Sequence, residues 1–418
     1  MKIRWYISKK HLEIMLISVI VFHSCFLNIS YVHVPKYDLI KLTLIICMIP
    51  YLLMNVKKIL VEKYQKINLC LFLFCISVFI SSYCGRNYAS HSYLSTFKFV
   101  MTIVVSVLFF ECINFYGNNT WKVVLTMFIG LSFFYVILND ILMLIVPNIF
   151  RASDELGMGD RFNCFFLGNK FNVVYLHLFF WTFYLLYQQL TKKNNKFYTV
   201  LLIGLVLCVS IFVKCSTGII AIIVFGILYF GKFEKYFFNP LITFISIGVC
   251  NTILLVNSAF LSMPIIKFVI EDILGKEIGL TGRLDIYARM GQLFVQNLWF
   301  GYGYENNAYV ALQTVLAANV QNGLFDNIVS FGIVGTSVLA MFIWVCLKFA
   351  QKNGKLNAFS YLMYTYIVIS SVEIVFRTNF IIIVALIAFC NINENGIIKQ
   401  EKWKAREEYE NKCNYTNI

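Results

Sequence analysis

Long apolar stretches separated by short polar segments run through most of the chain. A helix needs about 20 mostly apolar residues to cross a bilayer, and stretches near this length recur along the sequence. The predicted spans are 12–29, 38–55, 67–83, 94–116, 121–146, 171–190, 197–213, 217–231, 238–258, 324–347, 356–374 and 378–393. This pattern predicts an all-α polytopic membrane protein of about twelve transmembrane helices, with residues 1–418 as a single integral membrane domain.

One polar excursion breaks the pattern between the ninth and tenth spans, at residues 259–322. Within it, apolar residues recur at three- and four-residue spacing after Arg283, which predicts an amphipathic helix on the bundle or in the interface. These residues are Leu284, Tyr287, Met290, Phe294 and Leu298. A second apolar stretch, 308–320, is too short to span and predicts an interfacial or re-entrant helix.

Composition and charge agree with a membrane protein and suggest its orientation. The chain is 60% hydrophobic and 13% charged, with a formal charge of +14. Short cytoplasmic loops accumulate Lys and Arg; with both termini inside, the inner segments and the cytoplasmic tail 394–418 hold 22 of the 35 basic residues. The long loop is then extracytoplasmic. Six of the eight arginines also fall outside, either to bind phosphate or to form ordinary ion pairs: Arg86, Arg151, Arg161, Arg283, Arg289 and Arg377.

Several function classes lack their sequence signals. The basic residues are spread thinly over many loops, without the aromatic-interleaved basic stripe of a nucleic-acid surface. Walker loops, dinucleotide fingerprints and metal-spaced histidines are also missing, so we expect no cofactor, no metal and no nucleic-acid partner. Membrane lipids are the expected surroundings.

Gly282 and Arg283 open the predicted loop helix after Thr281, an acceptable N-cap. A cation is electrostatically misplaced at a helix N-terminus, where exposed N–H groups favour anions. Together these groups predict a phosphate or pyrophosphate site. The alternative is that Arg283 pairs with a loop carboxylate.

Two other outer segments carry candidate binding residues. Arg161 follows a glycine-rich turn and precedes Gly168 and Asn169, whose amide can donate to and accept from a sugar hydroxyl. Neutralisation by Asp160 is the alternative for Arg161. Lys214 lies at a helix entrance, where a lysine also commonly extends to the interface.

The end of the long loop carries the remaining candidates. Gln321 and Asn322 precede Asp326, an intramembrane carboxylate that is our candidate general base or acceptor-orienting group. Glu373 stands four residues before Arg377, either as a plain ion pair or as a second functional pair.

The order of these motifs resembles the O-antigen and capsular polysaccharide polymerases (Wzy-type), which are related to the O-antigen ligases. The likeness covers about residues 157–335 and rests on Arg161 with Gly168-Asn169, Ser216-Thr217-Gly218, Gly282-Arg283, Trp299-Phe300-Gly301-Tyr302-Gly303, Gln321-Asn322-Gly323 and Phe331-Gly332-Ile333-Val334-Gly335.

The resemblance implies an enzyme of the bacterial cytoplasmic membrane that joins polyprenyl-pyrophosphate-linked oligosaccharide repeat units on its outer face. Arg283, Arg161 and Asp326 are the expected catalytic residues. Expected substrate-binding residues are Gly282, Asn169, Lys214, Gln321, Asn322 and Arg377, and expected partners include a flippase and chain-length regulators.

One departure from the family favours a polymerase over a ligase. The family often has His-Asn where this chain has Gln321-Asn322, and a dependence on that histidine is expected of the ligases in particular. Glutamine cannot take up a proton. A lipid-linked oligosaccharide flippase or other carrier, and ligase-type glycosyl transfer, remain the alternatives.

Overall fold

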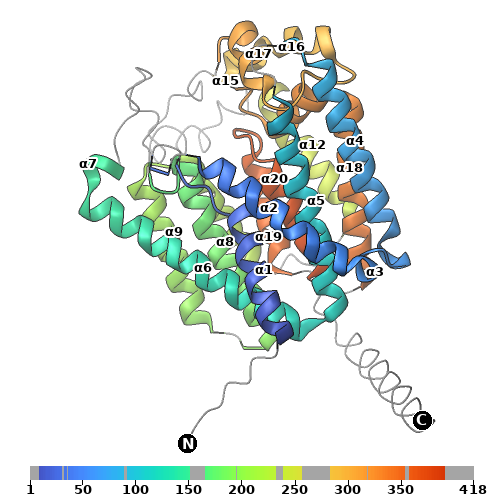
Figure 1. Cartoon of the computed structure of the whole chain (residues 1–418). Coiled ribbons are helices and arrows are strands. Elements are labelled where there is room, and N and C mark those ends of the chain that lie inside the picture. Colours follow the sequence, from blue (N-terminus) through green and yellow to red (C-terminus); the bar gives the residue numbers. More distant parts are fainter. Residues whose placement is uncertain are drawn as a thin grey trace, which may run out of the picture.

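The fold is a bundle of helices, seen here in a computed structural model (Figure 1). The structure describes residues 9–30, 33–34, 36–88, 92–150, 165–193, 195–231, 239–256, 283–317, 319–353 and 357–390. Within them it contains helices and one isolated β-bridge, between Phe165 and Gly168. The all-α prediction is therefore confirmed for this part of the chain.

Each of the twelve predicted spans overlaps one helix. These are α1 (Lys9–Cys25), α2 (Tyr37–Met54), α4 (Gln65–Cys84), α5 (Tyr93–Tyr116), α6 (Asn118–Ile145), α8 (Lys170–Thr191), α9 (Lys196–Phe212), α10 (Ser216–Gly231), α12 (Pro240–Val256), α18 (Gly323–Asn353), α19 (Ala358–Ile369) and α20 (Thr378–Phe389). Five helices of the described chain are long and apolar enough to cross a membrane, namely α2, α4, α5, α6 and α18. The protein is thus expected to be embedded in a membrane, and the total of twelve spans stays a prediction.

Shorter helices complete the described chain. They are α3 (Val56–Ile59), the 3₁₀ helix η1 (Glu62–Tyr64), α7 (Pro147–Phe150), α15 (Arg283–Ala288), α16 (Met290–Asn297) and α17 (Asn306–Val315). The amphipathic helix predicted after Arg283 is present as two pieces, α15 and α16, which meet at Arg289. Helices α15, α16 and α17 lie together at one end of the bundle, at the top of Figure 1, and we call them the cap.

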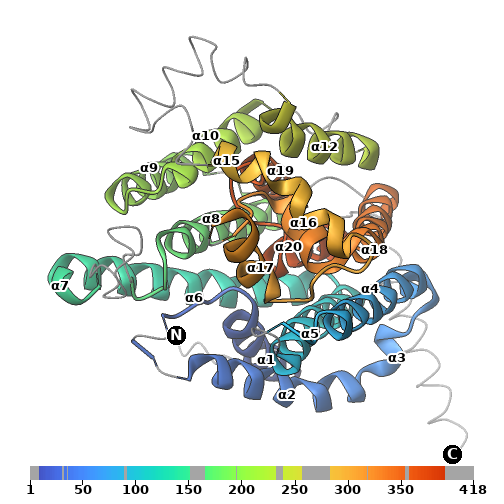
Figure 2. The same cartoon turned by 90° about the horizontal axis from the view of Figure 1, so that it is seen from above.

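Helices α19 and α20 occupy the centre of the bundle although they are the last of the described helices (Figure 2). Their sequences are apolar on all sides, as expected of helices without a solvent-facing stripe. Ten consecutive residues of α20, from Phe380 to Phe389, are buried. Helix α20 packs on α5, α18 and α19.

Aromatic side chains fill the bundle next to the C-terminal end of α1 and the N-terminal part of α8. The ring of Phe26 lies 5.0 Å from that of Phe179 and 5.2 Å from that of Phe183. Phe183 in turn contacts Phe128 of α6 at 5.1 Å. Because Phe179 and Phe183 follow Tyr175 by one and two helical turns, the interior below Tyr175 is closely packed.

The cap is joined to α18 through backbone groups. Tyr302 and Gly303 donate to the carbonyls of Val329 and Ser330 at 2.8 and 2.9 Å, and Val334 donates to Trp299 at 3.1 Å. Helix α18 is non-helical at Gly332, where φ is 67°. A Cβ there would lie 2.2 Å from the Trp299 carbonyl oxygen. The glycine motifs at 299–303 and 331–335 thus lie against each other. Only glycine fits at position 332, where the two backbones cross.

Candidate functional site

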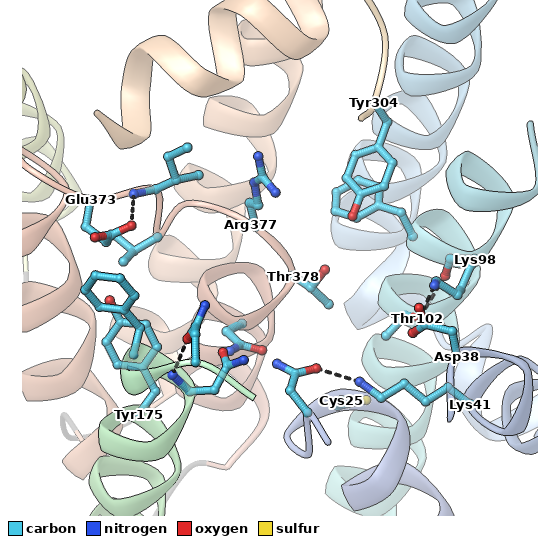
Figure 3. A pocket seen from close by; sticks show the side chains of 18 of the residues that line it. Cys25, Asp38, Lys41, Lys98, Thr102, Tyr175, Tyr304, Glu373, Arg377 and Thr378 are labelled. Carbon is cyan, nitrogen blue, oxygen red and sulfur yellow. Dashed lines mark hydrogen bonds and ion pairs between the residues drawn. The ribbon is translucent and has the colours of Figure 1, made fainter. Parts of the chain in front are cut away.

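A cavity of about 510 Å³ lies where the cap covers the bundle. Its walls come from the ends of α1, α2, α5 and α8, from α17, and from the α19–α20 connection. In the predicted orientation, all of these bundle ends face outside. Figure 3 shows the side chains arranged around the open space, with Arg377 and Thr378 on one side and Lys98, Asp38 and Lys41 on the other.

Arg377 is held in the cavity wall by a carboxylate behind it. Its Nε and Nη2 atoms donate to the two oxygens of Asp326 at 3.1 and 3.3 Å. The Asp326 side chain is 2% exposed, whereas that of Arg377 is 41% exposed and lines the cavity. Asn307 of α17 also donates to Asp326. Burial alone would lower the pKa of Arg377, but the Asp326 carboxylate raises it, so the guanidinium stays charged.

The loop that presents Arg377 is held in place at its start by three elements. The Ser370 carbonyl accepts from the Gly323 N–H at 2.8 Å, and the Ser370 hydroxyl accepts from Asn251 of α12 at 2.8 Å. From the cap, the Tyr287 hydroxyl contacts the carbonyls of Ser371 and Gln321 at 2.7 and 2.9 Å. Nearer Arg377, Glu373 accepts from the Ile374 N–H at 3.3 Å and lines the cavity.

The opposite wall carries two lysines on otherwise apolar helices. Lys98 of α5 pairs with Asp38 of α2 at 3.1 Å, and Lys41 donates to Asn28 at 2.6 Å (Figure 3). All four side chains line the cavity. Ionisable residues within apolar helices commonly face a functional interior, and here both lysines face the cavity.

Neutral hydrogen-bonding groups and aromatic rings make up much of the remaining lining. The cavity includes six asparagines and three tyrosines: Asn28, Asn169, Asn172, Asn307, Asn319, Asn379, Tyr175, Tyr304 and Tyr366. The Tyr304 ring stacks on Phe99 at 4.4 Å, and burial raises the pKa of its hydroxyl to about 12. The buried Tyr175 hydroxyl has no hydrogen-bond partner among the described residues. Amides that both donate and accept, beside aromatic faces, suit a polyhydroxylated ligand.

The structure brings three of the predicted site residues together at this cavity. Asn169 and Arg377 line it, and Asp326 supports Arg377. Asn169 also caps α8, because its side-chain oxygen accepts from the Asn172 N–H at 3.0 Å. Asp326 is not among the cavity-lining residues, so its position fits a supporting group better than a base in contact with substrate.

The other predicted residues lie elsewhere or outside the described part. Asn322 is buried and donates to the Asn251 carbonyl at 3.0 Å, while its side-chain oxygen caps the first turn of α18. Gln321 meets Tyr287 through its carbonyl. Lys214 is exposed and does not line the cavity. Arg283 begins α15, but its side chain, with Gly282 and Arg161, lies outside what the structure describes.

Sequence reasoning did not select Asp38, Lys41 or Lys98. A signal was present, since both lysines interrupt predicted apolar spans in the half of the chain with fewer loop motifs. As for metals, the described residues contain no cluster of three or more His, Cys, Asp or Glu side chains that could hold an ion.

Comparison with protein-family models and with curated proteins gives no match for this chain.

Proposed function

We propose that the protein is a polysaccharide polymerase that joins polyprenyl-pyrophosphate-linked oligosaccharide repeat units on the outer face of the cytoplasmic membrane. The observation that carries this proposal is the cavity beneath the cap. It combines charged groups for a phosphorylated leaving group with asparagines and tyrosines suited to sugar hydroxyls. The resemblance of the sequence motifs to the Wzy-type polymerases suggests the same function and shares Asn169 with the cavity lining.

In the proposed reaction, a hydroxyl of one lipid-linked repeat unit attacks the anomeric carbon of the glycan carried by another lipid. A glycosidic bond forms, the bond from the anomeric carbon to pyrophosphate breaks, and polyprenyl pyrophosphate leaves with the bonding electrons. The hydroxyl proton passes to a carboxylate at the cavity, for which Glu373 and Asp38 are the lining candidates.

Negative charge develops on the leaving pyrophosphate, so fixed cations near it stabilise the transition state. Arg377 is a candidate for this role because Asp326 uses its Nε and Nη2 atoms and fixes its orientation, while part of the guanidinium remains open to the cavity. Asp326 then acts as a positioning residue. Arg283 and Arg161 remain proposed pyrophosphate ligands on the grounds of sequence.

The carrier alternative receives less support from the packing. A translocation path would have to continue inward from the cavity, and the interior below Tyr175 is filled by Phe26, Phe179 and Phe183. Aromatic packing below Tyr175 suits chemistry at one membrane face better than a path through the bundle. A ligase would use a similar cavity with a different acceptor, and the glutamine at position 321 favours the polymerase.

The test uses the purified full-length protein in proteoliposomes with polyprenyl-pyrophosphate-linked repeat units as the only glycan substrate. A polymerase produces a ladder of lengthened glycans and releases polyprenyl pyrophosphate. Transfer of intact repeat units across the bilayer without lengthening would instead identify a carrier. Arg377→Gln should abolish the ladder, and Arg86→Gln, at an exposed outer position, is the matched control that should preserve it.

In cells, deletion of the protein distinguishes a polymerase from a flippase a second time. Loss of a polymerase leaves single lipid-linked repeats on the outer face, whereas loss of a flippase leaves them on the inner face.

A further inference from the structure

The wall formed by α1, α2 and α5 differs in charge from the wall that carries Arg377. On the Arg377 side, the guanidinium is already matched by the Asp326 carboxylate, and Glu373 adds another negative charge. On the opposite side, Lys41 and Lys98 face a single lining carboxylate, Asp38. Among the described side chains, the α1–α2–α5 wall therefore has one positive charge in excess.

Lys41 carries that excess. Asp38 pairs with Lys98 at 3.1 Å, whereas the hydrogen-bond partner of the Lys41 ammonium is the neutral Asn28 amide, at 2.6 Å. An ammonium has three donors, so Lys41 can bind an anion while it keeps its contact with Asn28. Ser24 and Thr102 line the cavity on the same wall. Their hydroxyls already donate to the carbonyls of Ile20 and Lys98 at 2.8 and 2.7 Å, so the two lysines are the donors for an anion there.

A lysine within an apolar helix is costly unless its charge is used or compensated. Asn28 fixes the position of the ammonium without neutralising it. A ligand anion would complete the compensation, and it would do so on the wall away from Arg377 (Figure 3).

We propose that Lys41, with Lys98 and Asn28, forms a second anion-binding subsite of the cavity, for a phosphoryl or carboxylate group carried by the substrate. The inference rests on the proposed function, because it gives the cavity two places for anionic groups of lipid-linked glycans. The leaving pyrophosphate would lie at the Arg377 wall. The second anion would be either the pyrophosphate of the other lipid-linked substrate or the carboxylate of an acidic sugar in the repeat unit.

Binding to the full-length protein in nanodiscs tests the subsite without requiring polymerisation. Two probes separate the sources of the anion: geranylgeranyl pyrophosphate and a glucuronate-containing oligosaccharide. Lys41→Gln should weaken one of them by at least about tenfold, the effect of losing a charge-assisted hydrogen bond. Lys41→Arg should retain most of the binding. Lys36→Gln, at an exposed lysine outside the cavity on the same side of the bundle, should leave binding unchanged.

A loss with the pyrophosphate probe assigns the subsite to a lipid pyrophosphate, and a loss with glucuronate assigns it to an acidic sugar. Unchanged binding of both probes to Lys41→Gln, at wild-type thermal stability, would overturn the proposal. If Lys41→Gln fails to fold, the proposal is tested with Lys98→Gln and with wild-type protein at increasing salt. Weaker probe binding in both experiments supports the subsite, and unchanged binding in both overturns it. Lys41-dependent binding in a protein that produces no glycan ladder would refute the polymerase and leave the subsite standing.

Discussion

Arg377 and Asp326 form a two-point ion pair in which the carboxylate is almost fully enclosed and the guanidinium partly faces the cavity. The pair joins the start of α20 to the first turn of α18, and the two residues are 51 positions apart in the chain. Asp326 thereby directs a cation toward the cavity from behind.

The first prediction concerns the role of Asp326. Asp326→Asn should lower the rate of polymerisation by about a hundredfold, because Arg377 loses its two-point partner and its orientation. As a positioning residue, Asp326 should affect the rate but not the shape of the pH–rate profile of the purified enzyme. Disappearance of an acidic limb in Asp326→Asn would show instead that Asp326 is the general base.

The second prediction concerns the stability of the same pair. Arg377→Gln leaves the enclosed Asp326 charge without its cation. Breaking a fully buried pair costs about 3–5 kcal/mol, and the partial exposure of Arg377 places the expected loss below that range. The double variant Asp326→Asn/Arg377→Gln should be destabilised by less than the sum of the two single variants. Additive shifts in thermal midpoint would show that the two side chains do not interact.

The third prediction concerns Asn169, which caps α8 and also lines the cavity. Asn169→Asp keeps the oxygen that accepts from Asn172 but removes the amide donor. It should raise the KM for the lipid-linked substrate by about tenfold, the effect of one lost hydrogen bond at a site, with unchanged thermal stability. Asn169→Ala also removes the cap and should destabilise by about 1 kcal/mol. Equal KM values for Asn169→Asp and wild type would exclude the amide from binding.

The fourth prediction uses the backbone crossing between the cap and α18. Gly332→Ala places a methyl group against the Trp299 carbonyl at a positive φ, so it should destabilise by at least about 1–3 kcal/mol from strain alone. Gly130→Ala, in α6 with nothing near the added carbon, should not destabilise, because alanine favours the helix more than glycine does. The comparison is made by thermal unfolding of the detergent-solubilised proteins. Similar midpoints would contradict the close approach of Gly332 to the Trp299 carbonyl.

The fifth prediction compares two arginines of the long loop. If Arg283 binds pyrophosphate through its planar guanidinium, Arg283→Lys should severely reduce glycan length despite retaining the charge. Arg289 is exposed at the junction of α15 and α16, and Arg289→Lys should be mild because exposed ion pairs contribute about 0–1 kcal/mol. The measurement is glycan length at matched protein level. Equal tolerance of both changes would remove Arg283 from the mechanism.

The sequence predicted the helices well because apolar length is a local property. Each predicted span overlaps an observed helix, and the amphipathic spacing after Arg283 located α15 and α16, although not their break at Arg289. Arg377 and Asn169 were selected because polar residues at the predicted outer ends of the spans are visible in the sequence, and both line the cavity.

The part of the site that sequence reasoning did not find depends on packing between segments that are distant in the chain. Lys41 and Lys98 reach the cavity only because α2 and α5 lie beside each other and α5 packs on α20. The pairing of Asp326 with Arg377, rather than a role for Asp326 at the cavity surface, likewise follows from how α18 meets α20. Neither relationship has a signature in residue spacing.

The central position of α20 has a consequence for biosynthesis. In chain order, the first residues that line the cavity come from about the first hundred positions, and the last are Arg377, Thr378 and Asn379. A nascent chain emerging from the ribosome therefore has an incomplete pocket until α20 has entered the bundle. Premature termination before residue 377 would yield a protein that still holds α2, α4, α5, α6 and α18 but cannot assemble the pocket. Such a product would be a membrane-resident chain without activity.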